Sequence, residues 1–214
     1  MIRNLATDNW ITLLFLFLVA ILVLLNYLFS IKFKDFILLF KKEQFYVKYY
    51  KTFVKTDLFF LFSSLFTVLV YVFVIYKVFL YFNKPVEINT FLLYLRIFGI
   101  TFWYVIIRYF LGLVIGNIFK INSYQDSFLY YKWLYLSKNA LLIFPFIIVF
   151  HYYNFSFGFV VLAAILAIIL VYNYFVLLSK NQKIIFKHLF YFILYLCTLE
   201  IAPLIIYLKI VFGV

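Results

Sequence analysis

Long runs of apolar residues constrain this chain more than any other feature of its sequence. A helix needs about 20 predominantly apolar residues to cross the hydrocarbon core of a bilayer. Runs that approach or exceed this length lie at Trp10 to Phe29, Leu58 to Phe82, Ile97 to Phe119, Leu134 to Tyr152, Phe155 to Leu178 and His188 to Leu208. The sequence therefore predicts an all-α integral membrane protein with about six transmembrane helices.

The overall composition agrees with a membrane protein and argues against several other classes. Hydrophobic residues make up 69% of the 214 positions, whereas roughly half is usual for a soluble domain. A formal charge of +12 would suggest nucleic acid as a partner of a soluble protein, but here membrane topology accounts for it better. One cysteine, Cys197, and two histidines, His151 and His188, provide neither a disulfide framework nor a zinc site. No metal, cofactor or nucleic acid is predicted.

Two of the six runs need an argument before they count as spans. The run at Leu134 to Tyr152 contains Lys138 and Asn139, so five spans are the alternative count. We retain it because FLYYKWLYL, at 128–136, extends it backward into the interface. The first run is too long for the apolar region of a typical signal peptide and lacks a small-residue cleavage motif, so we interpret it as a retained span.

The positions of lysine and arginine predict the orientation, because loops on the cytoplasmic side are enriched in these residues. The loops after the first, third and fifth runs carry Lys32, Lys34, Lys41, Lys42, Lys48, Lys51 and Lys55, then Lys120, Lys132 and Lys138, then Lys180, Lys183 and Lys187. The opposite side has Arg3, Lys84 and Lys209. Both termini are therefore predicted on the outer side of the membrane, with the basic loops in the cytoplasm.

The only sizeable segment between spans is a basic, amphipathic stretch at 30–57, within a single domain of residues 1–214. At 100° per residue, its aromatic residues gather on one side of a helical wheel and its lysines on the other. The aromatic set is Phe45, Tyr46, Tyr49, Tyr50 and Phe53, and the lysine set is Lys48, Lys51 and Lys55. This pattern predicts a helix in the cytoplasmic interface that contacts anionic headgroups. It either tethers the first two spans or docks a partner.

A carboxylate and a proline interrupt the last apolar run at Glu200 and Pro203. A charge in the bilayer is costly, so it marks either a partner or a function. At 1.5 Å per residue, Glu200 lies about 20 Å from Lys187 and Arg108 lies about 18 Å from Lys120, so the two charges lie at similar depth. A buried Arg108–Glu200 ion pair is predicted. The alternative is a substrate or proton site beside a helix kink at Pro203.

Other polar residues within the runs have simpler interpretations. Lys77 and Arg96 lie near the predicted outer ends of their spans, where long basic side chains reach the headgroups. Asn26 and Asn173 are placed to join the first and fifth spans by hydrogen bonds. Pro145 predicts a kink in the fourth span.

Enzyme chemistry has little support in the sequence. The chain contains no HExxH motif, no GxSxG motif and no glycine-rich phosphate loop, and its few acidic residues form neither a metal site nor a general acid/base pair. The chain is therefore predicted not to be an enzyme, without catalytic residues.

Two segments carry a family resemblance. DNWITLLFLFLVAILVLL near the start and FILYLCTLEIAPLIIYLK near the end resemble a family of small polytopic inner-membrane proteins of Bacteroidota, classed as a domain of unknown function. The resemblance implies an inner-membrane location in a Gram-negative cell. It implies no catalytic residues, and it favours an accessory role in envelope machines of that phylum, including type IX secretion and gliding.

These observations favour a non-enzymatic scaffold or accessory subunit of an inner-membrane complex, whose partners are other membrane subunits. The rival hypothesis is a small transporter or lipid-handling protein, in which Arg108 binds an anionic group and Glu200 couples to protons.

Overall fold

Helices make up the whole of the described structure. The computed structural model describes residues 9–38, 58–82, 89–118, 122–153, 155–180 and 202–212. Within these ranges the elements are α1 (Asn9–Leu28), α2 (Ser30–Leu38), α4 (Leu58–Phe82), α5 (Thr90–Ile118), α6 (Asn122–Tyr152), α7 (Ser156–Lys180) and α10 (Ala202–Phe212). Five of the described helices, α1, α4, α5, α6 and α7, are long and apolar enough to cross a membrane. The prediction of an all-α membrane protein is confirmed.

The helix bounds follow the apolar runs closely, with two differences. α5 begins at Thr90 rather than Ile97, and α6 extends from Asn122 through Lys138 and Asn139 to Tyr152. The span within α6 is Leu129–Tyr152, so the fourth predicted span is confirmed together with its backward extension. α6 also continues through Pro145. Of the sixth run, α10 contains only the last part, and the remainder lies outside the described residues.

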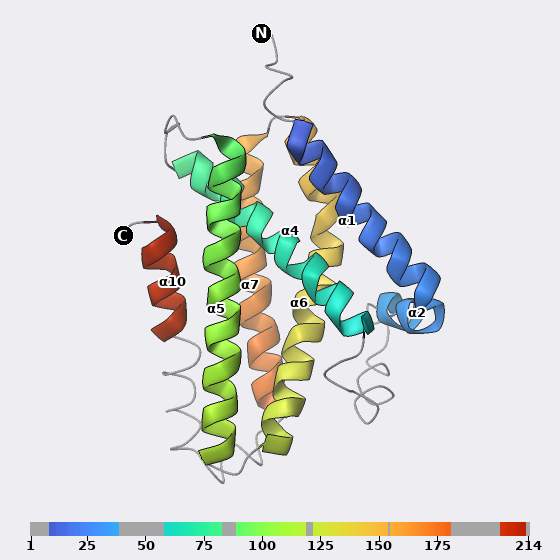
Figure 1. The fold of residues 1–214 in the computed structure, drawn as a ribbon, viewed down its shortest axis with the longest axis vertical. Coiled ribbons are helices and arrows are strands. Elements are labelled where there is room, and N and C mark those ends of the chain that lie inside the picture. Colours follow the sequence, from blue (N-terminus) through green and yellow to red (C-terminus); the bar gives the residue numbers. More distant parts are fainter. Residues whose placement is uncertain are drawn as a thin grey trace.

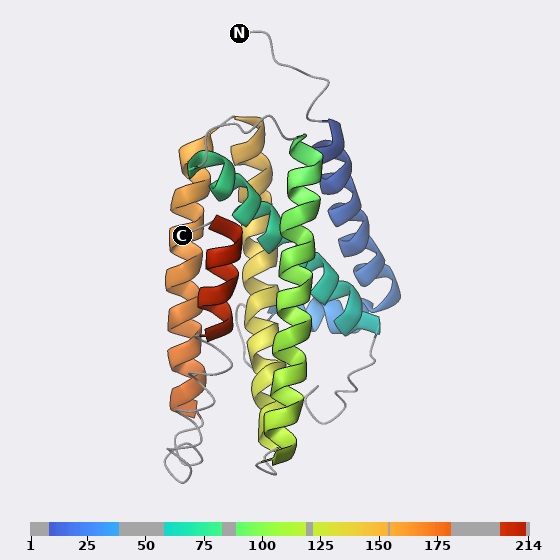
Figure 2. The ribbon, with the colours of Figure 1, turned by 60° about the vertical axis from the view of Figure 1, so that its left-hand side comes forward.

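The spanning helices alternate in direction, and α4 lies at their centre. Figures 1 and 2 show α1, α5 and α7 running from one end of the bundle to the other and α4 and α6 returning. In Figure 1, α4 crosses the bundle diagonally, and it packs against α1, α5, α6 and α7. α10 packs against α5, and α2 lies at the far end of α1. This alternation is what successive crossings of one bilayer require.

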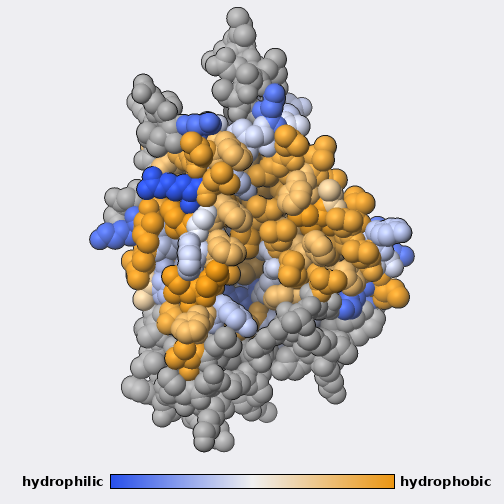
Figure 3. All heavy atoms as spheres, in the orientation of Figure 1, coloured by the Kyte–Doolittle hydropathy of each residue, from blue (hydrophilic) through white to orange (hydrophobic). Residues whose placement is uncertain are grey.

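The core consists mainly of large apolar side chains contributed by α4 and its neighbours. The buried side chains of α1 recur every three or four residues, as expected for one stripe of a helix: Ile11, Phe15, Leu18, Ile21 and Leu25. Phe15 meets Phe73 of α4 edge to face, with ring centroids 5.1 Å apart. The rest of the surface between the two ends is largely apolar, as Figure 3 shows for one face. A lipid-facing surface has this composition.

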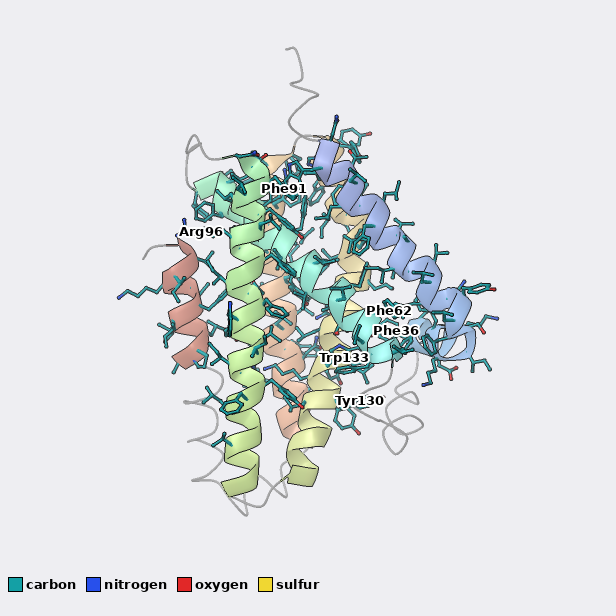
Figure 4. All side chains as sticks on the ribbon, viewed as in Figure 1. Phe36, Phe62, Phe91, Arg96, Tyr130 and Trp133 are labelled. Atoms are coloured by element: carbon teal, nitrogen blue, oxygen red, sulfur yellow. The ribbon has the colours of Figure 1, made fainter. Side chains whose placement is uncertain are left out.

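A cluster of aromatic rings joins the start of α1, the end of α4 and the start of α5. Trp10 lies 5.8 Å from Tyr76, 5.6 Å from Phe91 and 5.2 Å from Tyr94, measured between ring centroids. Its indole Nε1 donates a hydrogen bond to Thr90 Oγ1 at 3.3 Å. Offset and edge-to-face rings attract one another beyond their burial. The cluster therefore holds these three helix ends side by side. Phe91, one of its members, is labelled in Figure 4.

The turn between α6 and α7 depends on a glycine. The Phe155 N–H donates to the Phe150 carbonyl at 3.0 Å, and the Gly158 N–H donates to the Phe155 carbonyl at 3.1 Å. A Cβ atom at Gly158 would overlap the Phe155 ring and would lie 3.0 Å from Phe150 Cδ2. The absence of a side chain therefore permits the close approach of these two rings to the first turn of α7.

Candidate functional site: polar groups inside the bundle

Of the predicted site residues, the structure describes Arg108 and Pro203. Glu200 and the aromatic and lysine sets at 45–55 lie outside the described residues, so the ion pair and the interfacial helix at those positions stay predictions. Arg108 is half-buried on α5, and its Nη1 atom donates to the Tyr104 hydroxyl at 3.3 Å. Pro203 is the second residue of α10.

The contact between α5 and α10 shows where Arg108 lies relative to the last helix. The Tyr207 hydroxyl lies 2.9 Å from Thr101 Oγ1, and the Tyr207 ring lies 5.0 Å from the Tyr104 ring. The two helices run in opposite directions (Figure 1). Arg108, one turn beyond Tyr104, is therefore on the side of α5 that carries the α10 contact and is displaced toward the N-terminal end of α10. In sequence, Glu200 lies two residues before Ala202, the first residue of α10.

A second group of polar side chains was not predicted from the sequence. We call Ser63, Thr67, Tyr71, Ser137 and Asn139 the α4–α6 polar cluster. Thr67 Oγ1 lies 3.0 Å from Ser137 Oγ and 2.7 Å from the Ser63 carbonyl oxygen. The Thr67 hydroxyl donates to Ser137 Oγ across the two helices and to the Ser63 carbonyl within α4, so these two acceptors share its one proton. Both hydroxyls are buried near the middle of their spans.

Asn139 and Tyr71 complete the cluster one turn further along. The Tyr71 hydroxyl lies 3.5 Å from the Leu136 carbonyl oxygen, at the outer limit of a hydrogen bond. The Asn139 side chain faces the same hydroxyl, yet within the described residues its Nδ2 atom has no acceptor close enough for a hydrogen bond. Only 7% of Asn139 is exposed.

The sequence did contain a signal for this cluster. Ser63, Thr67 and Tyr71 are spaced four residues apart, so they lie on one face of α4. Asn139 counted against the fourth span because its polarity lowers the mean hydropathy of that run. The structure resolves this conflict: Asn139 is buried against α4 instead of facing lipid.

Lys77 packs against aromatic rings. Its side chain is half-buried and its ammonium Nζ lies 5.6 Å from the ring centroids of Phe73 and Tyr76 and 5.9 Å from that of Phe159. A cation over aromatic faces is stabilised most where water is scarce, so these rings stabilise the ammonium, and its reach to the headgroups stays a prediction. The ring of Phe73 also meets the buried His151 ring, with ring centroids 6.2 Å apart. Arg96 is exposed.

Aromatic contacts also join α2 to the start of α4, and the start of α4 to α6. Phe36 lies 6.0 Å from Phe59, while Phe60 lies 4.3 Å from Trp133, which is 6.5 Å from Tyr130. Figure 4 shows Phe36, Phe62, Trp133 and Tyr130 gathered at this corner of the bundle. The short helix α2 was not distinguished in the sequence because the whole segment 30–57 was treated as one piece.

The remaining polar predictions have separate outcomes. Asn26 is exposed on α1 and Asn173 is half-buried on α7, and their role in joining these spans by hydrogen bonds stays a prediction. The described residues also contain no group of three His, Cys, Asp or Glu side chains placed to hold a metal ion.

Comparison with known proteins adds the family. No curated protein and no solved structure matches the chain. One protein family matches residues 11–211, which is nearly the whole length and leaves out only the first two residues of α1 and the last residue of α10 among the described helices. The chain belongs to the family described as Domain of unknown function (DUF4271).

Proposed function

We propose that this multi-pass membrane protein is a non-enzymatic scaffold or accessory subunit of a complex in the bacterial inner membrane. A secretion or gliding machine of Bacteroidota is the setting that the sequence resemblance favours. The observation that carries the proposal is a large aromatic side chain on the outside of α5. Trp103 is 63% exposed and lies 13 residues after Thr90, which is about 20 Å along the helix.

The depth of Trp103 is unusual for an exposed tryptophan. Tryptophan is enriched at the two membrane–water interfaces, where its N–H meets water or headgroups. In the hydrocarbon region lipid tails provide no acceptor for the indole N–H. A transmembrane helix that places a Ser, Thr or Asn oxygen against Trp103 would satisfy this donor.

The neighbours of Trp103 suit such a contact. We call Gly99, Trp103, Ile106, Ile107 and Phe110 the α5 outer face; three- and four-residue spacing aligns them on one side of the helix. A Cβ atom at Gly99 would meet nothing within 4 Å, so a notch adjoins the Trp103 ring. Small residues beside large ones allow close approach of transmembrane helices. The α5 outer face is thus proposed as the contact surface for a helix of another membrane subunit.

Basic residues of α2 are proposed to face anionic headgroups on the cytoplasmic side. Lys34 is exposed, and Lys32 Nζ lies 5.8 Å from the centroid of the Phe29 ring. Lysines next to interfacial aromatic residues are attracted to anionic lipids. This placement, with both termini in the periplasm, agrees with the asymmetry of lysine across the loops.

Site-specific crosslinking in native membranes tests the subunit proposal. A photoreactive residue replaces Phe110 on the α5 outer face, and Ile168 of α7, which is 69% exposed, serves as the matched control. We expect one stoichiometric protein adduct from position 110 and only lipid adducts from position 168. Lipid adducts at both positions would refute docking on α5. An adduct of twice the chain mass would replace the subunit proposal by self-association.

Transport or lipid handling is the second candidate, favoured by the position of Arg108. A half-buried guanidinium inside a spanning helix is costly unless it serves a purpose, and it could bind an anionic group. After replacement of Cys197, a cysteine at Thr198 or Leu199 should then react with a water-soluble maleimide. Complete protection of both positions would remove this candidate.

A further inference from the structure

The α4–α6 polar cluster has an unequal distribution of hydrogen bonds. At its Ser63 end every hydroxyl is used: Ser63 Oγ bonds to the Phe59 and Phe60 carbonyl oxygens, and Thr67 pairs with Ser137. At the Asn139 end the side-chain amide has no hydrogen-bond acceptor in the described part of the chain. A buried amide without an acceptor is destabilising, and more so inside a bilayer.

The surroundings of Asn139 restrict what can satisfy this amide. Asn139 is 7% exposed and Ser137 is 2% exposed, so an acceptor on a lipid or a substrate of ordinary size has no access. The nearby Tyr71 hydroxyl and Leu136 carbonyl are only 3.5 Å apart, a loose contact that leaves lone pairs on both oxygens available. Three polar groups thus converge on one buried position.

We infer that one water molecule is bound between α4 and α6 in the middle of the membrane, held by Asn139 and Tyr71. The water accepts a hydrogen bond from Asn139 Nδ2 and donates to the Tyr71 oxygen and the Leu136 carbonyl. Buried waters in proteins commonly make about three hydrogen bonds to groups that otherwise lack partners. This water site is independent of any subunit docking on α5.

The bound water gives a structural role to Asn139, whose polarity counted against the fourth span. Thr67 and Ser137 pair directly across α4 and α6, and the Tyr71 hydroxyl makes a looser contact with the Leu136 carbonyl. The water adds Asn139 to these links. A water at this position also brings an exchangeable proton to the centre of the bundle.

Water-edited solid-state NMR of the full chain in lipid bilayers tests the inference directly. Magnetisation is transferred from water protons to ¹⁵N-labelled side chains. Asn9, exposed at the start of α1, is the positive control, and the Trp103 indole, exposed to lipid at mid-span, is the negative control. We expect the Asn139 amide to receive magnetisation as Asn9 does. An Asn139 signal as weak as that of Trp103 would overturn the proposal.

Two variants make the assignment specific. Asn139→Leu identifies the Asn139 signal by its loss; if this variant does not fold, residue-selective labelling of the wild-type chain provides the same assignment. Tyr71→Phe removes one partner of the water and keeps the ring. We expect it to weaken the transfer to Asn139 and to leave that to Asn9 unchanged. Unchanged transfer to both would exclude Tyr71 as a ligand of the water.

Discussion

The hydroxyl groups of Thr101 and Tyr207 lie 2.9 Å apart and link two helices that are far apart in sequence. Thr101 also donates toward the Ile97 carbonyl at 2.8 Å, so its single proton is directed within α5 and Tyr207 donates across to it. The Tyr207 ring packs on Tyr104 in the same contact. Tyr207 therefore joins α10 to α5 by one hydrogen bond and one ring contact.

Replacing Tyr207 by phenylalanine should loosen α10 without removing its ring contact. Hydrogen bonds between transmembrane helices contribute about 0.6 kcal/mol on average and up to about 1.7 kcal/mol, so we expect Tyr207→Phe to destabilise the protein by an amount in this range. Thermal unfolding in detergent measures it. Tyr27, which is 83% exposed, provides the control: Tyr27→Phe should have almost no effect, and equal effects would refute a specific role for Tyr207.

Thr67 and Ser137 should show energetic coupling between α4 and α6. In a double-mutant cycle with Thr67→Val and Ser137→Ala, removal of either hydroxyl leaves the other without its partner, so the double variant should lose less stability than the two single variants together. The coupling is expected at about 0.6 to 1.7 kcal/mol.

Ser64 distinguishes this coupling from a general effect of lost hydroxyls. Its Oγ donates at 2.8 Å to the Leu61 carbonyl of its own helix. A cycle that pairs Ser64→Ala with Ser137→Ala should therefore be additive. Additivity in both cycles would show that the contact between Thr67 and Ser137 contributes nothing.

Two glycines should respond to alanine in opposite ways. Gly158→Ala must displace the Phe155 ring from the end of α6, and forcing an extra methyl group into a packed site costs about 1 to 3 kcal/mol. Gly99→Ala places its methyl in open space, where alanine favours a helix over glycine by up to about 1 kcal/mol. Unfolding midpoints of both variants check this, and a fall for Gly99→Ala equal to that for Gly158→Ala would contradict it.

The orientation predicted from lysine can be measured with two described positions. In a chain with Cys197 replaced, cysteines are introduced separately at Asn9 and Lys34. A thiol reagent that does not cross the inner membrane should label position 9 in cells with a permeable outer membrane and position 34 only after the inner membrane is opened. The reverse pattern would invert the topology.

The predicted ion pair is tested by comparing single and double charge removal. Loss of one partner leaves an uncompensated buried charge, at a cost of about 3 to 5 kcal/mol. Glu200→Gln alone should therefore reduce the yield of folded protein more than Glu200→Gln combined with Arg108→Gln. Equal yields would show that the two residues do not pair.

The spans could be predicted because their length and apolarity reflect the solvent that surrounds them. Leu58–Phe82 was placed without error, and Lys138 and Asn139 did not prevent a correct fourth span. Helix neighbours could not be predicted, since a helix that is apolar on all sides provides little indication of which face is buried. Nothing local to Phe15 or Phe73 indicates that these two rings meet.

The candidate site shows the same limit. A charged residue such as Arg108 is conspicuous in an apolar run, so the sequence identified it at once. Ser63, Thr67 and Ser137 are ordinary in membrane helices because a hydroxyl can bond to a carbonyl of its own helix. Only the packing of α4 on α6 distinguishes Thr67, which has a partner across the interface, from Ser64, which bonds within its own turn.

The central position of α4 also determines the order in which the protein can be assembled. α4 precedes α6 and α7 in the chain, and synthesis proceeds from the N-terminus, yet these later helices cover much of its surface. A nascent chain that ends before α6 therefore presents Ser63 and Thr67 without the helix that buries them. Because Ser63 and Thr67 bond to carbonyl oxygens of α4 itself, their hydroxyls have acceptors in the bilayer before α6 and α7 have been made.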